Sequence, residues 1–272
     1  MRILSLLSQS AYQGLVIFLS FSAFPMLSFG TEPARVGDFS LLDAHGYFHS
    51  MSWYDDHRAL VLLSHSSTDA SMSRAIARLE SLADSAADEF EFFLIDSEGK
   101  HNREAIAAAM AERGSELPVL MDDAQLIGEA LALSHSGEFL VFDPRSFSVV
   151  GRGHNLDSQY TQVQALLGAM ANGGDFAAAA EVLAASTKLT GAGESAVAID
   201  YPAQRLHAAN TPSYREDIAP IISENCASCH REGGIAPFAM DSHTMVLGWS
   251  PMIREVLMTK RMPPGQIDAH IG

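Results

Sequence analysis

The run Ala59-Leu-Val-Leu-Leu63 is a short, uninterrupted apolar segment, a pattern that predicts a buried β-strand. Residues 72–87 follow with apolar side chains at helical spacing on one side and charged side chains elsewhere. The next apolar run, Phe90-Glu-Phe-Phe-Leu-Ile95, predicts a second strand. Strands that alternate with helices in this way favour an α/β layered fold.

The same alternation continues on the carboxyl side of this unit. The expected elements are helices over 102–113 and 124–133, strands over 117–121, 139–142 and 147–150, and two helices over 158–186 broken at 172–175. Asn102 fits a helix N-cap and Gly114 a helix stop, because asparagine accepts from free amides and glycine adopts the left-handed conformation that ends helices. The last two strands form a hairpin.

Composition excludes several classes of protein. The chain has 272 residues, of which 47% are hydrophobic and 18% charged, so neither a disordered chain nor a coiled coil fits. Its formal charge of −16 argues against a nucleic-acid-binding surface, which needs lysine and arginine to meet phosphates. Almost all of the acidic excess lies before residue 211.

The first 30 residues predict export. Arg2 is their single charge, an apolar stretch covers 15–29, and small residues stand at Ser28 and Gly30. This pattern is typical of a signal peptide, residues 1–30, with the mature protein beginning near Thr31 in the periplasm. The alternative is an uncleaved anchor, and only then would the chain contact a membrane.

Both cysteines of the chain lie in one motif, Cys226-Ala-Ser-Cys-His230. In c-type haem attachment each thiol adds to one vinyl group, and the histidine after the second cysteine becomes an axial ligand of the iron. The motif therefore predicts one covalent haem c, held by Cys226 and Cys229 and ligated by His230. A thioredoxin-type dithiol would follow a strand, whereas a short amphipathic helix is expected before Cys226. Zinc would need a second Cys/His pair at finger spacing, which the sequence lacks.

The sixth iron ligand should be a methionine or histidine on the carboxyl side of the motif. The candidates are Met240, His243, Met245, Met252, Met258, Met262 and His270. A helix is expected over 251–261, with Pro251 in its first turn and Met252 on its apolar face, and Met258 beside Arg254 and Arg261. We assign Met262, because the following Pro263-Pro264 restricts the backbone and can aim one side chain.

Residues 214–265 also resemble a known module. They are similar to the c-type cytochrome module that, in exported bacterial proteins, often precedes a copper type II, ascorbate-dependent monooxygenase-like domain. The resemblance is carried by Asp217-Ile-Ala-Pro-Ile, Cys226-Ala-Ser-Cys-His-Arg, Gly234-Ile-Ala-Pro-Phe, Met252-Ile-Arg-Glu-Val and Arg261-Met-Pro-Pro-Gly. It implies a small all-α haem domain and independently favours Met262 as ligand. The family normally adds one more helix, so this domain looks incomplete, and without a copper domain no monooxygenase activity is implied.

Residues 36–157 resemble a thioredoxin-like redoxin domain of the thiol peroxidase type. The matching stretches are Val36-Gly-Asp-Phe, Ser67-Thr-Asp-Ala-Ser-Met-Ser-Arg74, Leu117-Pro-Val-Leu-Met-Asp122 and Gly137-Glu-Phe-Leu-Val-Phe-Asp-Pro144. Where the family carries its reactive cysteine, this chain has Ala70 followed by Ser71. A thiolate is the nucleophile of that chemistry, so the resemblance implies a domain without thiol peroxidase activity.

The sequence thus predicts an α/β thioredoxin-like domain over 31–186, a linker over 187–212 and a small all-α cytochrome c-like domain over 213–272. One-electron transfer to redox partner proteins is the expected function, with the redoxin domain as a docking or structural module. Alternatives are a haem enzyme that reduces peroxide, and a haem subunit covered by a partner chain. Four histidines over 45–65 could bind copper, although solvated loop residues are the simpler interpretation.

Overall fold

Residues 34–86, 88–99, 103–174 and 195–265 are those that the computed structural model of the chain describes. From Pro33 on they belong to one compact unit, Pro33–Gly272. The predicted signal peptide, the N-cap Asn102, the second helix expected before residue 187 and His270 lie outside the described residues.

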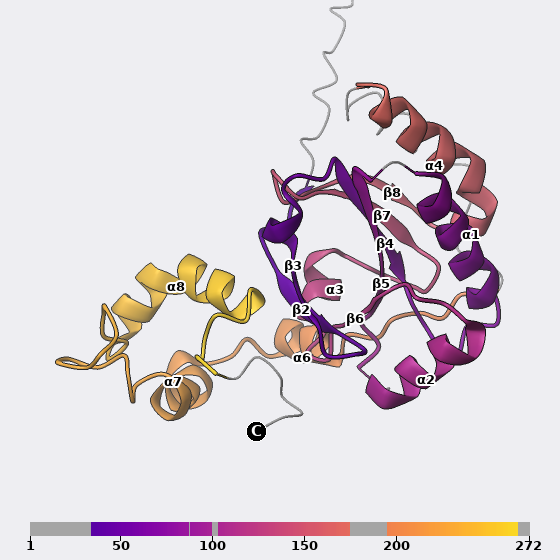
Figure 1. Ribbon diagram of the computed structural model, residues 1–272. Coiled ribbons are helices and arrows are strands. Elements are labelled where there is room, and N and C mark those ends of the chain that lie inside the picture. The colour runs from indigo at the N-terminus through magenta and orange to yellow at the C-terminus, as the bar shows by residue number, and fades with distance from the viewer. Residues whose placement is uncertain (1–33, 87, 100–102, 175–194, 266–272) are drawn as a thin grey trace, which may run out of the picture. The chain divides into compact units, whose positions relative to one another are not determined.

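An eight-stranded mixed sheet forms the centre of the α/β part, in the order β1-β8-β7-β4-β5-β6-β2-β3 (Figure 1). Its strands are β1 (Ala34–Arg35), β2 (Ser40–Asp43), β3 (Phe48–Ser50), β4 (Ala59–Ser64), β5 (Phe90–Asp96), β6 (Val119–Met121), β7 (Phe139–Asp143) and β8 (Ser148–Gly153). The helices of this part are η1 (Met51–Tyr54), α1 (Met72–Ser85), α2 (Arg103–Arg113), α3 (Leu126–Ala130) and α4 (Leu156–Ala171).

Four neighbouring strands of this sheet define the fold. β4 and β5 are parallel and are joined by α1, while β7 pairs with the other edge of β4 in the antiparallel sense. β8 then pairs antiparallel with β7 as the expected hairpin, and α4 follows. A mixed sheet in the order β5-β4-β7-β8 with helices on its faces fits a thioredoxin-like domain, which confirms the α/β fold class.

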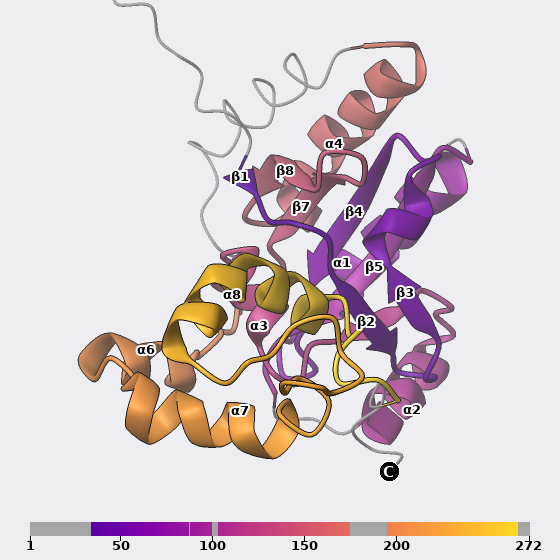
Figure 2. The same ribbon diagram turned by 90° about the vertical axis from the view of Figure 1, so that its left-hand side faces the viewer.

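Alternation along the strands divides the core into two layers. Val61 and Leu63 of β4 face one way and pack with α1, α2 and α4, whereas Leu60 and Leu62 face α3 and η1. Figure 1 shows α1, α2 and α4 on one side of the strands and α3 on the other, and Figure 2 looks onto the side of α3. All four side chains are fully buried, so β4 is the apolar centre around which both layers form.

The expected strands and helices around β4 are confirmed as β4, α1 and β5, but the helix expected over 124–133 is much shorter. Helix α3 covers only Leu126–Ala130. Gln125 before it and Ala132 after it have φ values of 58° and 53°, which take the backbone out of the helical region at both ends.

Beyond residue 195 the described chain is largely helical. The helices are α6 (Pro202–Ala209), η2 (Tyr214–Ile218), α7 (Ala219–Asn225) and α8 (His243–Met258). The stretch expected to be a linker therefore contains α6. The same stretch also contacts the α/β part, because the amide of Ser136 donates to the carbonyl of Val197 (2.9 Å).

Helix α8 begins eight residues earlier than the sequence indicates, so the assignment of Pro251 to its first turn is wrong. Ser242 caps the helix through its side-chain oxygen, which accepts from the amide of Met245. Pro251 inside the helix cannot donate to the carbonyl of Leu247, but the Ser250 hydroxyl donates to that carbonyl at 2.8 Å. This substitute bond allows the helix to continue through the proline.

We expect Gly153→Ala to destabilise the α/β part by about 1–3 kcal/mol, the cost of overpacking a core. A Cβ at this position would lie 2.2 Å from the buried ring of Phe139. Gly168→Ala in α4 is the matched control, because a Cβ there meets nothing within 4 Å. It should stabilise by about 0.5–1 kcal/mol through helix propensity. Urea unfolding of both variants measures this, and equal midpoints would contradict the packing argument.

Candidate functional site

The residues of the Cys-x-x-Cys-His motif form one tight turn at the end of α7. Cys226 is the C-cap of that helix, and its carbonyl accepts from the amides of Cys229 (3.2 Å) and His230 (2.9 Å). Both thiols are free and half-buried. Burial raises the pKa of the Cys226 thiol above its usual range. The turn thus presents both sulfur atoms and the imidazole from five consecutive residues.

The imidazole of His230 is held in one orientation. Its ring is buried, and Nδ1 lies 3.1 Å from the carbonyl oxygen of Phe238. A carbonyl can only accept, so Nδ1 donates to it, and Nε2 is the ring nitrogen left to ligate a metal. Metal-ligating histidines are commonly oriented by such a bond from their other nitrogen to a backbone carbonyl.

The loop over 231–240 folds back onto the motif. Ala236 donates its amide to the carbonyl of Cys229 (3.2 Å), and Met240 donates to the carbonyl of His230 (2.9 Å). A Cβ on Gly234 would lie 2.3 Å from the carbonyl oxygen of Cys229, so this close approach requires glycine. The loop thereby brings the Phe238 carbonyl to His230.

Aromatic rings connect the motif to α8. The ring centroids of His230 and Phe238 are 4.8 Å apart, and those of Phe238 and Trp249 are 4.4 Å apart with near-parallel planes. Trp249 belongs to α8, which leads to the predicted sixth ligand. Sequence reasoning missed this stack, since tryptophan at position 249 has no spacing signal that relates it to the motif.

Met262 lies just beyond the end of α8, whereas Cys226, Cys229 and His230, the other residues predicted to bind haem, follow α7. Its amide donates to the carbonyl of Val256 (3.2 Å), and its side chain is 40% exposed. Met258, expected beside Arg254 and Arg261 and off the apolar face of the helix, is instead buried among core residues of the α/β part. Met252, expected on the apolar face, is exposed, so both placements are wrong.

Several large apolar side chains are exposed in the segment that carries the motif. Most of the large exposed apolar residues in the described chain lie between positions 221 and 262, namely Ile221, Ile235, Met245, Leu247, Met252, Leu257 and Met262. The two free thiols and the oriented imidazole on one turn are the groups that could hold a porphyrin, which attaches through sulfur.

The second site predicted from sequence lies between the end of β4 and the start of α1. Ala70 is exposed there, in the place where the resemblance expects a reactive cysteine. A cavity of about 470 Å³ opens at this point. Its lining includes Ala70, Ser71, Arg74, Ser136, Gly137, His154, Asn155 and Ser195. None of these side chains is a thiol, so the cavity lacks the nucleophile of a thiol peroxidase.

Asp69, beside this cavity, is a buried carboxylate that sequence reasoning did not single out. Its oxygens accept from the hydroxyls of Ser71 (2.7 Å), Ser136 (2.6 Å) and Ser195 (2.9 Å). Burial by itself raises the pKa of Asp69, but these hydrogen bonds outweigh it and hold that pKa below its usual value. Three serines scattered over 125 positions give no sequence signal.

The histidines over 45–65 do not converge. His49 lies 3.3 Å from Asp43, His57 2.7 Å from Asp56, and Nδ1 of His65 3.0 Å from Asp96 in the core. Within the described ranges no group of three or more histidine, cysteine or acidic side chains could hold a metal ion. Copper binding by this segment gains no support.

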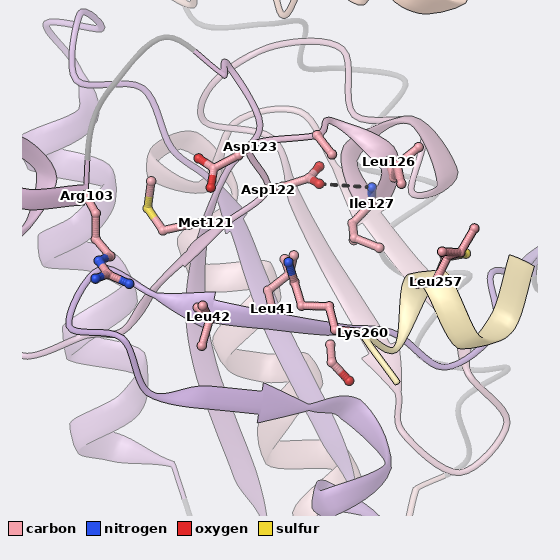
Figure 3. Close-up of a pocket in the computed structure, with 13 residues that line it drawn as sticks. Leu41, Leu42, Arg103, Met121, Asp122, Asp123, Leu126, Ile127, Leu257 and Lys260 are labelled. Carbon is pink, nitrogen blue, oxygen red and sulfur yellow. Dashed lines mark hydrogen bonds between the residues drawn. The ribbon is translucent and has the colours of Figure 1, made fainter. Parts of the chain in front are cut away.

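A smaller pocket of about 140 Å³ lies where the end of α8 meets the α/β part (Figure 3). Leu41, Ile127, Leu257 and Lys260 are among its lining residues. The adjoining carboxyl group of Asp122 has its pKa raised to about 6 by burial, although the amides of Ile127 and Gly128 donate to it.

The comparisons with known proteins show a similarity of fold and nothing further. No protein-family model and no curated protein matches the chain. A solved protein of Sinorhizobium meliloti 1021, described as hypothetical, is 20% identical over 63% of this chain and 94% of its own, with a TM-score of 0.49. A thiol:disulfide interchange protein from Bacteroides sp. is 14% identical over 50% of this chain and 90% of its own (TM-score 0.43). Peroxidoxin BcpB from Mycobacterium tuberculosis is 17% identical over 50% of this chain and 96% of its own (TM-score 0.44).

We expect Asp69→Asn to lower the free energy of unfolding at pH 7 by about 1.5–3 kcal/mol, since it removes charged hydrogen bonds in the core. The folded pKa of Asp69 lies below its unfolded value, so its contribution is present above about pH 4 and is lost as the pH falls through the folded pKa. The difference from wild type should therefore shrink in acid.

Denaturant unfolding between pH 3 and 7 measures this dependence, where these pH values are approximate limits set by the ordinary pKa of aspartate. Asp84→Asn, on the exposed side of α1, is the matched control and should change stability by less than about 0.5 kcal/mol. Parallel curves for wild type and Asp69→Asn would contradict the argument.

Proposed function

We propose that this chain is an exported c-type haem protein that transfers single electrons. Cys226 and Cys229 would hold the haem through two thioether bonds, and His230 would ligate its iron. The observation that carries the proposal is the hydrogen bond from Nδ1 of His230 to Phe238, which leaves Nε2 available beside two free thiols on the same turn. The exposed apolar side chains within residues 221–262 are consistent with it.

The protein's part in this chemistry is to hold the haem and to shield it. When bound, haem supplies an iron that can gain or lose one electron. The Phe238 carbonyl orients the His230 ring, and the 231–240 loop limits its movement. Met262 would supply a second ligand to the iron, and a thioether ligand favours the reduced iron and so raises the potential.

The thioredoxin-like domain takes no part in thiol chemistry under this proposal. The chain's two cysteines are both in the haem motif, and Ala70 occupies the nucleophile position. Several solved proteins of similar fold act in redox chemistry according to their names, which is consistent with a redox role. The domain's acidic surface would dock a redox partner protein, because complementary charge guides encounters between electron-transfer proteins.

We place the protein in the periplasm, where c-type haem is attached. This rests on the N-terminal sequence pattern. Of the helices that the structure describes, none has the length and apolarity to cross a membrane.

Mass spectrometry of protein produced in a bacterium with c-type haem maturation machinery tests the proposal. Wild type should gain the mass of one haem, resistant to acid extraction because thioether bonds are covalent. Cys226→Ser combined with Cys229→Ser should abolish the adduct. Ser228→Ala, an exposed residue of the same turn, should keep it. Free thiols and an unmodified mass in wild type would refute the proposal.

A further inference from the structure

We propose that the thioredoxin-like domain positions the distal haem ligand, with Met258 as the anchor that fixes Met262. This inference rests on the proposed haem function and assigns the domain a task that needs no thiol. Met258 is a positioning residue in this scheme, since it acts only through Met262.

Met258 is the point at which α8 enters the core of the α/β part. Its side chain is 5% exposed and packs in the buried cluster that contains Phe39, Leu41 and Ile127. It is the member of that cluster contributed by α8. Arg254, one turn earlier, donates to the carbonyl of Val36 at 3.3 Å. The last turn of α8 is therefore held by an apolar plug and a hydrogen bond.

The five residues from Met258 to Met262 have little freedom. Thr259 is buried, and its amide and hydroxyl both donate to the carbonyl of Glu255 (2.9 and 2.8 Å). Lys260 adopts the left-handed conformation (φ 52°) that closes a helix. The amides of Arg261 (2.9 Å) and Met262 (3.2 Å) then both donate to Val256. A displacement of Met258 is transmitted to Met262 through this cap.

The other end of the motif-bearing segment is fastened to the same domain. The amide of Ile199 donates to the carbonyl of Ser134 (3.0 Å), and the side-chain amide of Gln125 donates to the carbonyl of Asp200 (2.8 Å). The α/β part thus holds both ends of the segment that carries His230 and Met262. This arrangement suits a domain that sets the distance between two ligands that follow different helices.

Anchoring matters because a weak ligand binds iron only for the fraction of time that it is in place. A methionine on a loose chain end would leave the sixth position open to small external ligands such as carbon monoxide. Fixing the chain raises the occupied fraction without any new bond to the iron. The proposal therefore predicts that emptying the Met258 site opens the iron although Met262 itself is unchanged.

The test compares four variants of the full, haem-loaded chain: Met262→Ala, Met258→Ala, Met258→Leu and Met252→Ala. Covalent haem is first verified by mass. Two measurements follow, the red absorption band that methionine gives when it ligates ferric iron, and the rate of carbon monoxide binding to the reduced protein. Met252 is the matched control, because it is an exposed methionine of the same helix.

Met262→Ala should lose the band and bind carbon monoxide fastest. Met258→Ala should weaken the band and bind carbon monoxide on the order of ten times faster than wild type, as an open fraction raised ten-fold requires. Met258→Leu keeps an apolar plug of similar volume and should restore wild-type behaviour, and Met252→Ala should not differ from wild type. A Met258→Ala protein that matches Met252→Ala, while Met262→Ala loses the band, overturns the inference and leaves the haem proposal standing.

Two further results are distinguishable from these. Wild-type protein without covalent haem refutes the proposed function itself. A normal band in Met262→Ala shows a different distal ligand and overturns the inference. If Met258→Ala does not fold, Arg254→Ala loosens the same turn without emptying the core. It should shift both measurements in the same direction by a smaller amount, and an unchanged spectrum and rate would again overturn the inference.

Discussion

The buried carboxylate of Asp69 is the interaction on which the arrangement of this chain depends. A charge in a protein interior is tolerated only when its oxygens are fully hydrogen-bonded. Ser71 comes from the start of α1, Ser136 from the turn before β7 and Ser195 from the stretch that leads to the helical segment. The Ser136 hydroxyl also accepts from the amide of Val197 (2.8 Å), so the carboxylate fastens the later chain to the sheet.

Much of the fold was predictable from local pattern, because apolar runs such as 59–63 form strands wherever both faces of a sheet are covered. The Cys-x-x-Cys-His motif at 226–230 could also be found from the sequence, because its residues are neighbours in the chain. Asp69 and Met258 could not, because their partners are distant in the chain. The start of α8 was placed wrongly at Pro251 for a related reason. A proline in a helix is usually in its first turn, and here the Ser250 hydroxyl allows Pro251 to lie inside the helix.

The fold does not require the cysteine that the resemblance expects. Ala70 is exposed, while the packing of the sheet relies on β4, β5 and β7, whose apolar residues are buried on both faces. The packing of the sheet therefore does not depend on which side chain stands at position 70. Such a domain is available for another use, and the contacts of Met258 and Ile199 indicate that use as a support for the helical segment.

The helical segment is attached to the α/β part at Asp200 and at Met258. It therefore forms a closed loop that leaves this part and returns to it. The cost of closing a loop grows only with the logarithm of its length, about 0.6 kcal/mol for each doubling. The sheet is consequently almost insensitive to how many residues lie between the two attachment points. The segment could be exchanged for another of different length and chemistry, provided that the ends of the new segment made the same two contacts. The α/β part can therefore support different segments inserted between these two attachment points.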